Sequence, residues 1–267
     1  MARPVAVDDP GDPRLADYVG LTDAVLRRRI EDGRGVFIAE GELVIRQLLV
    51  SGYAVRSVLV TPARLARLED VLAPLDAPVF VAPAAVLEAV AGFALHRGAV
   101  AAASRPAAAE PATLLARSRT VAVLEGLNDH ENIGTLFRNA AALGVDAVLL
   151  SPTTADPLYR RSVRVSMGCV LHVPFATLTP WPDALATVTG AGFELVALTP
   201  GPGAEPVDVL DGMTGPVAIL LGAEGPGLTD GALGAATRRV RIPMRGGVDS
   251  LNVATAAALA FHHLQRV

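Results

Sequence analysis

A glycine-rich loop that follows an apolar run is the first feature of this sequence able to support chemistry. Residues 217–221 are all apolar, and the loop 222–227 (GAEGPG) follows at once with Glu224 as its single acid. Glycines let a backbone turn sharply and approach a ligand closely. The loop has neither the lysine and hydroxyl of a phosphate-binding loop nor the spacing of a dinucleotide fingerprint. A nucleoside triphosphate or NAD is therefore disfavoured, and a plain turn from a strand into a helix stays open as the alternative.

Two further segments carry polar side chains within or just before a stretch that is expected to be helical. Residues 132–140 read NIGTLFRNA, and residues 250–256 read SLNVATA shortly after the tripeptide IPM at 242–244. A helix starting near Asn132 would gather Ile133, Leu136, Phe137, Ala140 and Ala141 on one apolar stripe, with Thr135, Arg138, Asn139 and Ala142 on the other side. Arg138 then has no packing role, and it is either a solvated arginine or a ligand contact.

Each polar residue of these segments also has a structural interpretation. Asn132 could cap its helix, and Ser250 or Asn252 could begin the last helix, because serine and asparagine are favoured at that position. Glu224 could be a surface turn residue. These roles do not exclude a role in chemistry.

Together and in this order, the three segments resemble the three motifs of the TrmH (SpoU) family of RNA 2′-O-ribose methyltransferases, members of the knotted SPOUT superfamily. The resemblance covers residues 120–267 closely and residues 20–105 loosely. It implies an α/β fold with a mostly parallel sheet and a C-terminal trefoil knot, together with a smaller N-terminal α/β domain.

The resemblance also implies S-adenosylmethionine as cofactor, held bent by main-chain groups of three loops. Gly222, Ile242 and Leu251 stand at the matching positions, and we expect Leu198 and Thr199, at the end of the preceding strand, to add further wall. No metal is expected, because the methyl donor already carries its activating charge.

For catalysis, the family places a functional arginine at Arg138, close to the target ribose, and a supporting asparagine at Asn132. Glu224 is expected to hold neighbouring polar groups in place, and Ser250 and Asn252 to line the site of methyl transfer. Because a guanidinium stays protonated, we expect Arg138 to act with the substrate phosphate in orienting the ribose hydroxyl.

Composition narrows the class of protein. The net charge of −4 argues against binding nucleic acid over the whole surface, although all 23 basic side chains are arginines and several form clusters, at 27–29, 160–164 and 238–241. Arginine suits phosphate recognition. Within 159–168, the resemblance makes Arg164 and Ser166 candidates for RNA backbone contacts.

The lone Cys169 excludes an internal disulfide, and no targeting signal or membrane span is visible, so we expect a cytoplasmic protein.

We expect two domains, residues 1–105 and residues 120–267, joined by a linker at 106–119. An alanine-rich stretch from about Ala101 is interrupted by Pro106 and Pro111, which resist a continuous helix. Upstream, β-branched runs alternate with amphipathic stretches, and FIAEG at 37–41 with HRG at 96–98 loosely resembles the family's ribosomal-protein-like substrate-binding domain.

Downstream, five largely buried strands are expected at 120–124, 146–150, 193–198, 217–221 and 240–242, each followed by a loop and a helical stretch. Such a pattern favours a parallel sheet covered on both faces, with ligands at the carboxyl ends of the strands.

The leading hypothesis is an RNA ribose 2′-O-methyltransferase that works as a homodimer, because the family's active sites lie at a dimer interface. We expect 23S ribosomal RNA as the target, since relatives with this kind of N-terminal extension often act on it. The alternatives are a transfer-RNA 2′-O-methyltransferase, a catalytically silent module that binds RNA or S-adenosylmethionine, and a nucleotide-dependent oxidoreductase. The joint presence of the polar motif residues argues against the silent module.

Overall fold

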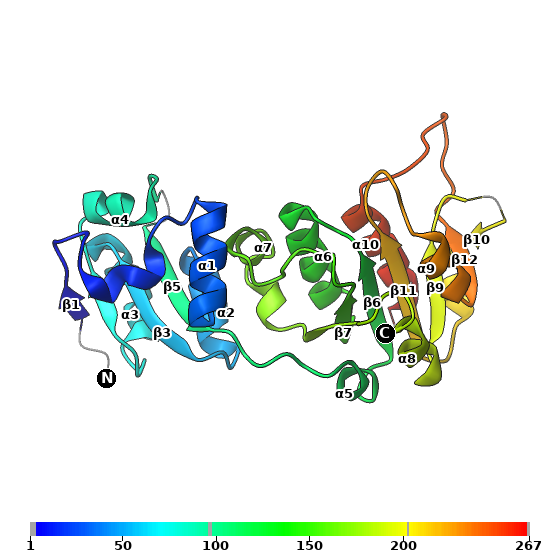
Figure 1. The fold of residues 1–267 in the computed structure, drawn as a ribbon, viewed down its shortest axis with the longest axis horizontal. Helices are drawn as coiled ribbons and strands as arrows, with labels where there is room; N and C mark the ends of the chain where they lie inside the picture. The colour runs from blue at the N-terminus through cyan, green and yellow to red at the C-terminus, as the bar shows by residue number, and fades with distance from the viewer. Residues whose placement is uncertain (1–3, 96–97, 202, 266–267) are drawn as a thin grey trace. The chain divides into compact units, whose positions relative to one another are not determined.

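The computed structural model describes residues 4–95, 98–201 and 203–265, which form two compact units. The N-terminal unit comprises residues 1–107 and 158–171, and the C-terminal unit comprises residues 108–157 and 172–267 (Figure 1). His96 and Arg97 of the expected HRG motif lie outside the described residues.

The N-terminal unit contains a five-stranded mixed sheet in its described residues. The strand order is β1 (Pro4–Ala6), β4 (Val79–Val81), β3 (Val55–Val60), β5 (Ala99–Ser104) and β2 (Val36–Glu40). Strand β5 runs antiparallel to both neighbours, and the other pairs are parallel. The helices are α1 (Ala24–Arg34), α2 (Glu42–Val50), α3 (Pro62–Leu72), α4 (Ala84–Ala91) and α7 (Arg160–Val165), with 3-10 turns η1 (Pro13–Tyr18) and η2 (Cys169–Leu171).

Strand β5 corrects our view of the alanine-rich stretch. Residues Ala99–Ser104 form a buried strand between β3 and β2, whereas we expected the boundary region to begin near Ala101. Alanine has low strand propensity, but burial on both faces of a sheet decides the conformation here. Residues 111–115, inside the expected linker, form the short helix α5 (Pro111–Leu115) of the C-terminal unit.

Residues 158–171 group with the N-terminal unit, although we expected them in the catalytic domain. Helix α7 packs against β2, and η2 packs against α2. The approach is close at Gly168, where an added Cβ would lie 2.7 Å from the Cβ of Gln47. The segment therefore completes the N-terminal core, and the sequence alone gives no sign of this long-range packing.

The C-terminal unit contains a seven-stranded sheet in its described residues, and all of its strand pairs are parallel. The order is β10 (Glu205–Pro206), β12 (Arg238–Arg241), β9 (Glu194–Leu198), β11 (Val217–Gly222), β6 (Thr120–Glu125), β7 (Ala147–Leu150) and β8 (Phe175–Thr177). The other elements are α6 (His130–Ala142), α8 (Leu185–Gly190), α9 (Asp230–Ala235), α10 (Val253–Leu264) and the 3-10 turn η3 (Val207–Gly212). The expected mostly parallel α/β fold is confirmed.

The sheet brings the motif segments to one edge. Strands β12, β9, β11 and β6 are consecutive neighbours and run in the same direction, so their carboxyl ends lie side by side. Helices α6 and α10, which carry the first and third motifs, pack against each other (Figure 1). Among the described residues, no helix has the length and apolar character to cross a membrane.

Candidate cofactor pocket and active site

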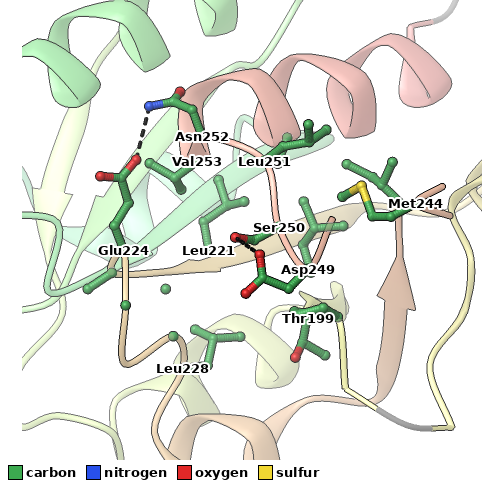
Figure 2. Close-up of a pocket in the computed structure, with 18 residues that line it drawn as sticks. Thr199, Leu221, Glu224, Leu228, Met244, Asp249, Ser250, Leu251, Asn252 and Val253 are labelled. Carbon is green, nitrogen blue, oxygen red and sulfur yellow. Dashed lines mark hydrogen bonds between the residues drawn. The ribbon is translucent and has the colours of Figure 1, made fainter. Parts of the chain in front are cut away.

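A pocket of about 410 Å³ opens at the carboxyl ends of β9, β11 and β12 (Figure 2). Its wall comes from three loops, at 198–200, 221–228 and 242–256. The five predicted cofactor residues all line it: Leu198, Thr199, Gly222, Ile242 and Leu251. Of the five predicted catalytic residues, three also line it: Glu224, Ser250 and Asn252. Segments far apart in the sequence thus meet around one cavity.

The lining is apolar with a few acids. Leucine, isoleucine, valine and methionine side chains provide much of the wall, and Glu224 and Asp249 are the charged residues among those that line it. Among the described residues, no arginine lines the pocket. A polyphosphate would meet carboxylates here without a basic partner, whereas a ligand with an apolar ring and positive charge suits the wall. Sequence reasoning missed Met244 and Asp249, although the IPM tripeptide and the neighbouring Ser250 pointed to both loops.

Gly222 is required by the loop's own fold. A Cβ at Gly222 would lie 2.4 Å from the carbonyl carbon of Gly227 and 2.5 Å from the backbone nitrogen of Leu228. The Gly227 N–H donates to the carbonyl of Ala223 (3.0 Å), which folds the loop back on its strand. Our expectation that this glycine admits the ligand therefore changes: at Gly222 the close neighbour is the returning loop backbone.

Asn252 connects the three motifs. Its Nδ2 donates to Oδ1 of Asn132 (2.7 Å) and to Oε1 of Glu224 (2.9 Å), the second bond drawn in Figure 2. Its Oδ1 accepts from the backbone nitrogens of Ala254 and Thr255 and caps α10. Asn252, rather than Ser250, is thus the helix cap. Four hydrogen bonds thus fix the Asn252 side chain next to Glu224 at the pocket.

Asn132 is not a helix cap. Asp129 caps α6, since its Oδ1 accepts from the Glu131 N–H (2.8 Å), and Asn132 is 8% exposed one turn later. Its bond to Asn252 replaces the expected support of Arg138. Six residues of helix separate Asn132 from Arg138, a rise of about 9 Å with the two side chains on different sides of the helix.

Arg138 is exposed on α6 and does not line the pocket of its own chain. Most of the expected apolar stripe is buried, but Ala141 is exposed because it lies near the end of α6. The neighbouring Asn139 donates to the carbonyl of Ala254 (2.9 Å) and ties α6 to α10. Arg138 is thus an exposed residue on a helix that packs against α10.

Comparison with known proteins decides the family. Residues 119–262 match the SpoU rRNA Methylase family. An uncharacterised tRNA/rRNA methyltransferase of Mycobacterium tuberculosis is 49% identical over 262 residues, which is 97% of this chain and 91% of that protein. The chain belongs to the SpoU rRNA methylase family. It is an RNA methyltransferase.

Solved structures show the same fold over nearly the whole chain of this SpoU methylase. An RNA 2′-O ribose methyltransferase superposes with a TM-score of 0.76 at 27% identity, covering 97% of this chain and 98% of that one. An AdoMet-bound rRNA methyltransferase from Sinorhizobium meliloti superposes with a TM-score of 0.83, covering 98% of this chain and 97% of that one. Its identity is 24%, so this second likeness speaks for the fold.

The arginine clusters of this SpoU methylase are largely structural. Arg27 is 1% exposed and binds Glu31 (Nη2 to Oε1, 3.2 Å) and the carbonyl of Asp17 (2.8 Å). Burial lowers the pKa of Arg27, and the adjacent Glu31 carboxylate opposes that effect. Arg160 and Arg164 pair with the buried Glu40.

Arginines of the remaining cluster, and Ser166, also bind groups of the protein itself. Arg238 binds Glu194 (2.8 Å) and Glu205 (2.8 Å), while Arg241 donates to the carbonyl of Ala204. Ser166 is fully buried and donates to the carbonyl of Val163 (2.9 Å), so the expected RNA contact there is wrong. Arg27, Arg160, Arg164 and Arg238 are thus engaged by acids of the protein itself.

Within the part of the chain that the structure describes, no group of three or more histidine, cysteine, aspartate or glutamate side chains could hold a metal ion.

Proposed function

We propose that this protein transfers the methyl group of S-adenosylmethionine to a ribose 2′-hydroxyl of RNA. The observation that carries the proposal is the pocket, because residues from three loops that were chosen on sequence grounds all line one cavity. The likeness to the solved RNA 2′-O ribose methyltransferase supports ribose as the target. S-adenosylmethionine is the methyl donor of this family, and an AdoMet-bound neighbour shares the fold.

The pocket fits this cofactor in size and in chemistry. Its volume of about 410 Å³ lies within the range of small-molecule sites, roughly 300–1,000 Å³. Apolar walls at Leu198, Ile242 and Leu251 suit an adenine held by main-chain groups, and the carboxylates of Glu224 and Asp249 suit the positive charges of the ligand.

The chain's own residues would orient the RNA. S-adenosylmethionine supplies a methyl group activated by the sulfonium charge. The ribose oxygen forms a bond to the methyl carbon as the carbon–sulfur bond breaks, the hydroxyl proton is released, and S-adenosylhomocysteine remains. In our proposal Asn252, held by Glu224 and Asn132, and the exposed Ser250 position the ribose at the pocket mouth. Positioning of this kind contributes much of an enzyme's rate enhancement.

Arg138 motivates a homodimer as part of the proposal. It is exposed and is not among the residues that line the pocket of its own chain, and in our proposal a second subunit brings it to the ribose. We propose that the partner's Arg138 binds the phosphate next to the target ribose through its two-pronged guanidinium. We also propose the trefoil knot around the cofactor loops and a cytoplasmic location.

For the RNA, we propose 23S ribosomal RNA selected by the N-terminal domain at residues 1–105. The family's description as rRNA methylases supports this choice, while the tRNA/rRNA name of the mycobacterial relative keeps transfer RNA as the second candidate. Total RNA from a strain lacking the gene, methylated with the purified protein and mapped by ribose-methylation-sensitive cleavage, tests both. We expect one new site in 23S RNA. A site in transfer RNA would overturn the choice of RNA, and no methylation at all would favour the silent module.

A further inference from the structure

Glu125 is a buried carboxylate that the proposed chemistry does not use. It ends strand β6 in the C-terminal unit, and it is 5% exposed. It is not among the residues that line the pocket. A carboxylate inside a protein requires hydrogen-bond donors to offset its loss of water. Its partners therefore tell what it holds in place.

Three donors converge on this carboxylate. Thr229 supplies two of them: its backbone N–H donates to Oε2 (2.9 Å), and its hydroxyl donates to Oε1 (2.7 Å). The third is the indole N–H of Trp181, which also donates to Oε1 (2.7 Å). Thr229 is in addition the N-cap of α9 and accepts from the Ala232 N–H. One acidic side chain thus joins β6, α9 and the segment before α8.

Glu125 is next to both ends of the glycine-rich loop. At the start of the loop, Gly222 of β11 is the sheet partner of Glu125 in the register between β11 and β6. At the end of the loop, Thr229 follows Leu228 and is held by the Glu125 side chain. The residues in between supply one wall of the pocket. The shape of that wall depends on the distance between the two ends.

We infer that Glu125 is a positioning residue that holds the glycine-rich loop in the shape that the cofactor pocket requires. The inference rests on the proposed function, because it treats the pocket as the cofactor site. A loop fixed at both ends has little conformational freedom to lose when a ligand binds. Without the carboxylate, the end of the loop at Thr229 would lose its anchor, and the strand end with the bonds at Ala223 and Glu224 would remain to hold the loop.

Glu125→Gln is the sharpest substitution, because it keeps the size of the side chain. The amide oxygen can serve the Thr229 N–H or the donors at Oε1, but in either orientation the amide NH₂ faces a remaining donor. An unsatisfied buried group of this kind typically costs enough to weaken binding roughly ten- to hundredfold. Glu194→Gln is the matched control. Glu194 begins β9, whereas the pocket lies at the other end of this strand, and its carboxylate pairs with the partly exposed Arg238.

The first readout needs no ligand. Hydrogen exchange of the backbone amides in residues 223–229 should become faster by roughly tenfold or more in Glu125→Gln, and should stay at the wild-type rate in Glu194→Gln. Trp181 is the single tryptophan of the chain. Its emission spectrum should therefore shift in Glu125→Gln and report directly that the hydrogen bond from its indole has changed.

The second readout is the affinity for S-adenosylmethionine by calorimetry. We expect a dissociation constant raised roughly ten- to hundredfold in Glu125→Gln, with KM for the cofactor raised in parallel and kcat at saturating cofactor little changed. If Glu125→Gln does not fold, Thr229→Val serves in its place: it removes the hydroxyl bond to Glu125 together with the α9 cap, and it keeps the backbone bond. Thr229→Ser retains both bonds and should restore most of the affinity.

The outcomes distinguish a failure of the proposed function from a failure of the positioning role of Glu125. Wild-type protein that binds no S-adenosylmethionine would refute the proposed function, whatever the loop does. Wild-type binding together with unchanged exchange and unchanged affinity in a folded Glu125→Gln protein would overturn the positioning role. Faster exchange and weaker binding in Glu125→Gln, with neither change in Glu194→Gln, would support it.

Discussion

The charged side chains in the core of the N-terminal unit differ in burial from those placed around the candidate site of the C-terminal unit. In the N-terminal unit, buried acids are paired with arginines: Glu31, 3% exposed, binds Arg27 and Arg105, and the buried Asp17 binds the more exposed Arg34 and Arg56. In the C-terminal unit, Glu224 and Arg138 are both exposed, the first at the pocket and the second on α6.

The difference shows how to tell a structural charge from a functional one. A buried ion pair must be satisfied on both sides, since removing one partner leaves an uncompensated charge. An exposed charge that stands on a rigid element without contributing to packing is available for a substrate. Clustering in sequence does not separate the two cases, because the arginines at 27, 160 and 238 are engaged by acids while the isolated Arg138 remains open.

The strongest effect on stability is expected at Arg27. Arg27→Ala removes one arginine partner from the buried Glu31, and breaking a buried pair typically costs about 3–5 kcal/mol. Urea unfolding followed by circular dichroism should show an earlier transition. Trp181 fluorescence reports on the C-terminal unit and should shift less. Equal shifts by both probes would mean that the two units unfold as one.

The strongest effect on chemistry is expected at Arg138. Arg138→Ala should leave folding and cofactor affinity nearly intact while single-turnover methyl transfer falls by roughly a hundredfold or more, as for loss of a key transition-state contact. Arg138→Lys should recover little, because a point charge cannot reproduce the planar fork. A near-normal transfer rate in Arg138→Ala would return this side chain to an ordinary surface role.

A mixed dimer sharpens the Arg138 prediction. Arg138→Ala and Glu224→Ala should each be nearly inactive as homodimers. If the partner's Arg138 completes each site, co-expression of the two variants should restore activity, because one pocket then has an intact Glu224 and faces an intact arginine. Transfer by tandem-tagged heterodimers is the measurement. Absence of restoration in verified heterodimers would place Arg138 and Glu224 in one chain's site.

Substitutions at Asn252 should have smaller effects, and they should separate thermal stability from methyl transfer. Asn252→Ala removes the α10 cap, which typically costs about 1 kcal/mol, together with the links to Asn132 and Glu224. Asn252→Asp keeps the cap oxygen but sets a carboxylate against Glu224. We therefore expect thermal stability to be largely kept in Asn252→Asp, with transfer impaired in both variants. Full activity in Asn252→Asp would show that the link to Glu224 is dispensable.

Arg238 should show the smallest effect. The Glu194 carboxylate beside it raises the pKa of its guanidinium, but both side chains are partly exposed. Such pairs contribute about 0–1 kcal/mol to the free energy of unfolding. Arg238→Ala should therefore unfold at nearly the wild-type urea concentration and transfer methyl groups normally. A large loss of RNA affinity in this variant would show that the pair opens to bind phosphate.

Much of the C-terminal unit could be predicted from sequence because its strands are continuous apolar runs. The runs at 120–124 and 217–221 became β6 and β11, and the polar segments that follow the strands meet at one edge because parallel strands end together. The same reasoning failed where the signal is nonlocal. Alanine-rich β5 forms because its neighbours bury it, and Glu125 owes its role to Thr229 and Trp181, which are distant in sequence.

The central claim, that RNA ribose is methylated at this pocket, is tested most directly by the chemical identity of the product. RNA methylated by the wild-type protein with methyl-labelled S-adenosylmethionine is digested to nucleosides, which are then separated by chromatography. We predict that the label appears in a 2′-O-methylnucleoside and that Arg138→Ala and Asn252→Ala lower its yield. Label in a methylated base, or an undiminished yield in both variants, would contradict the account.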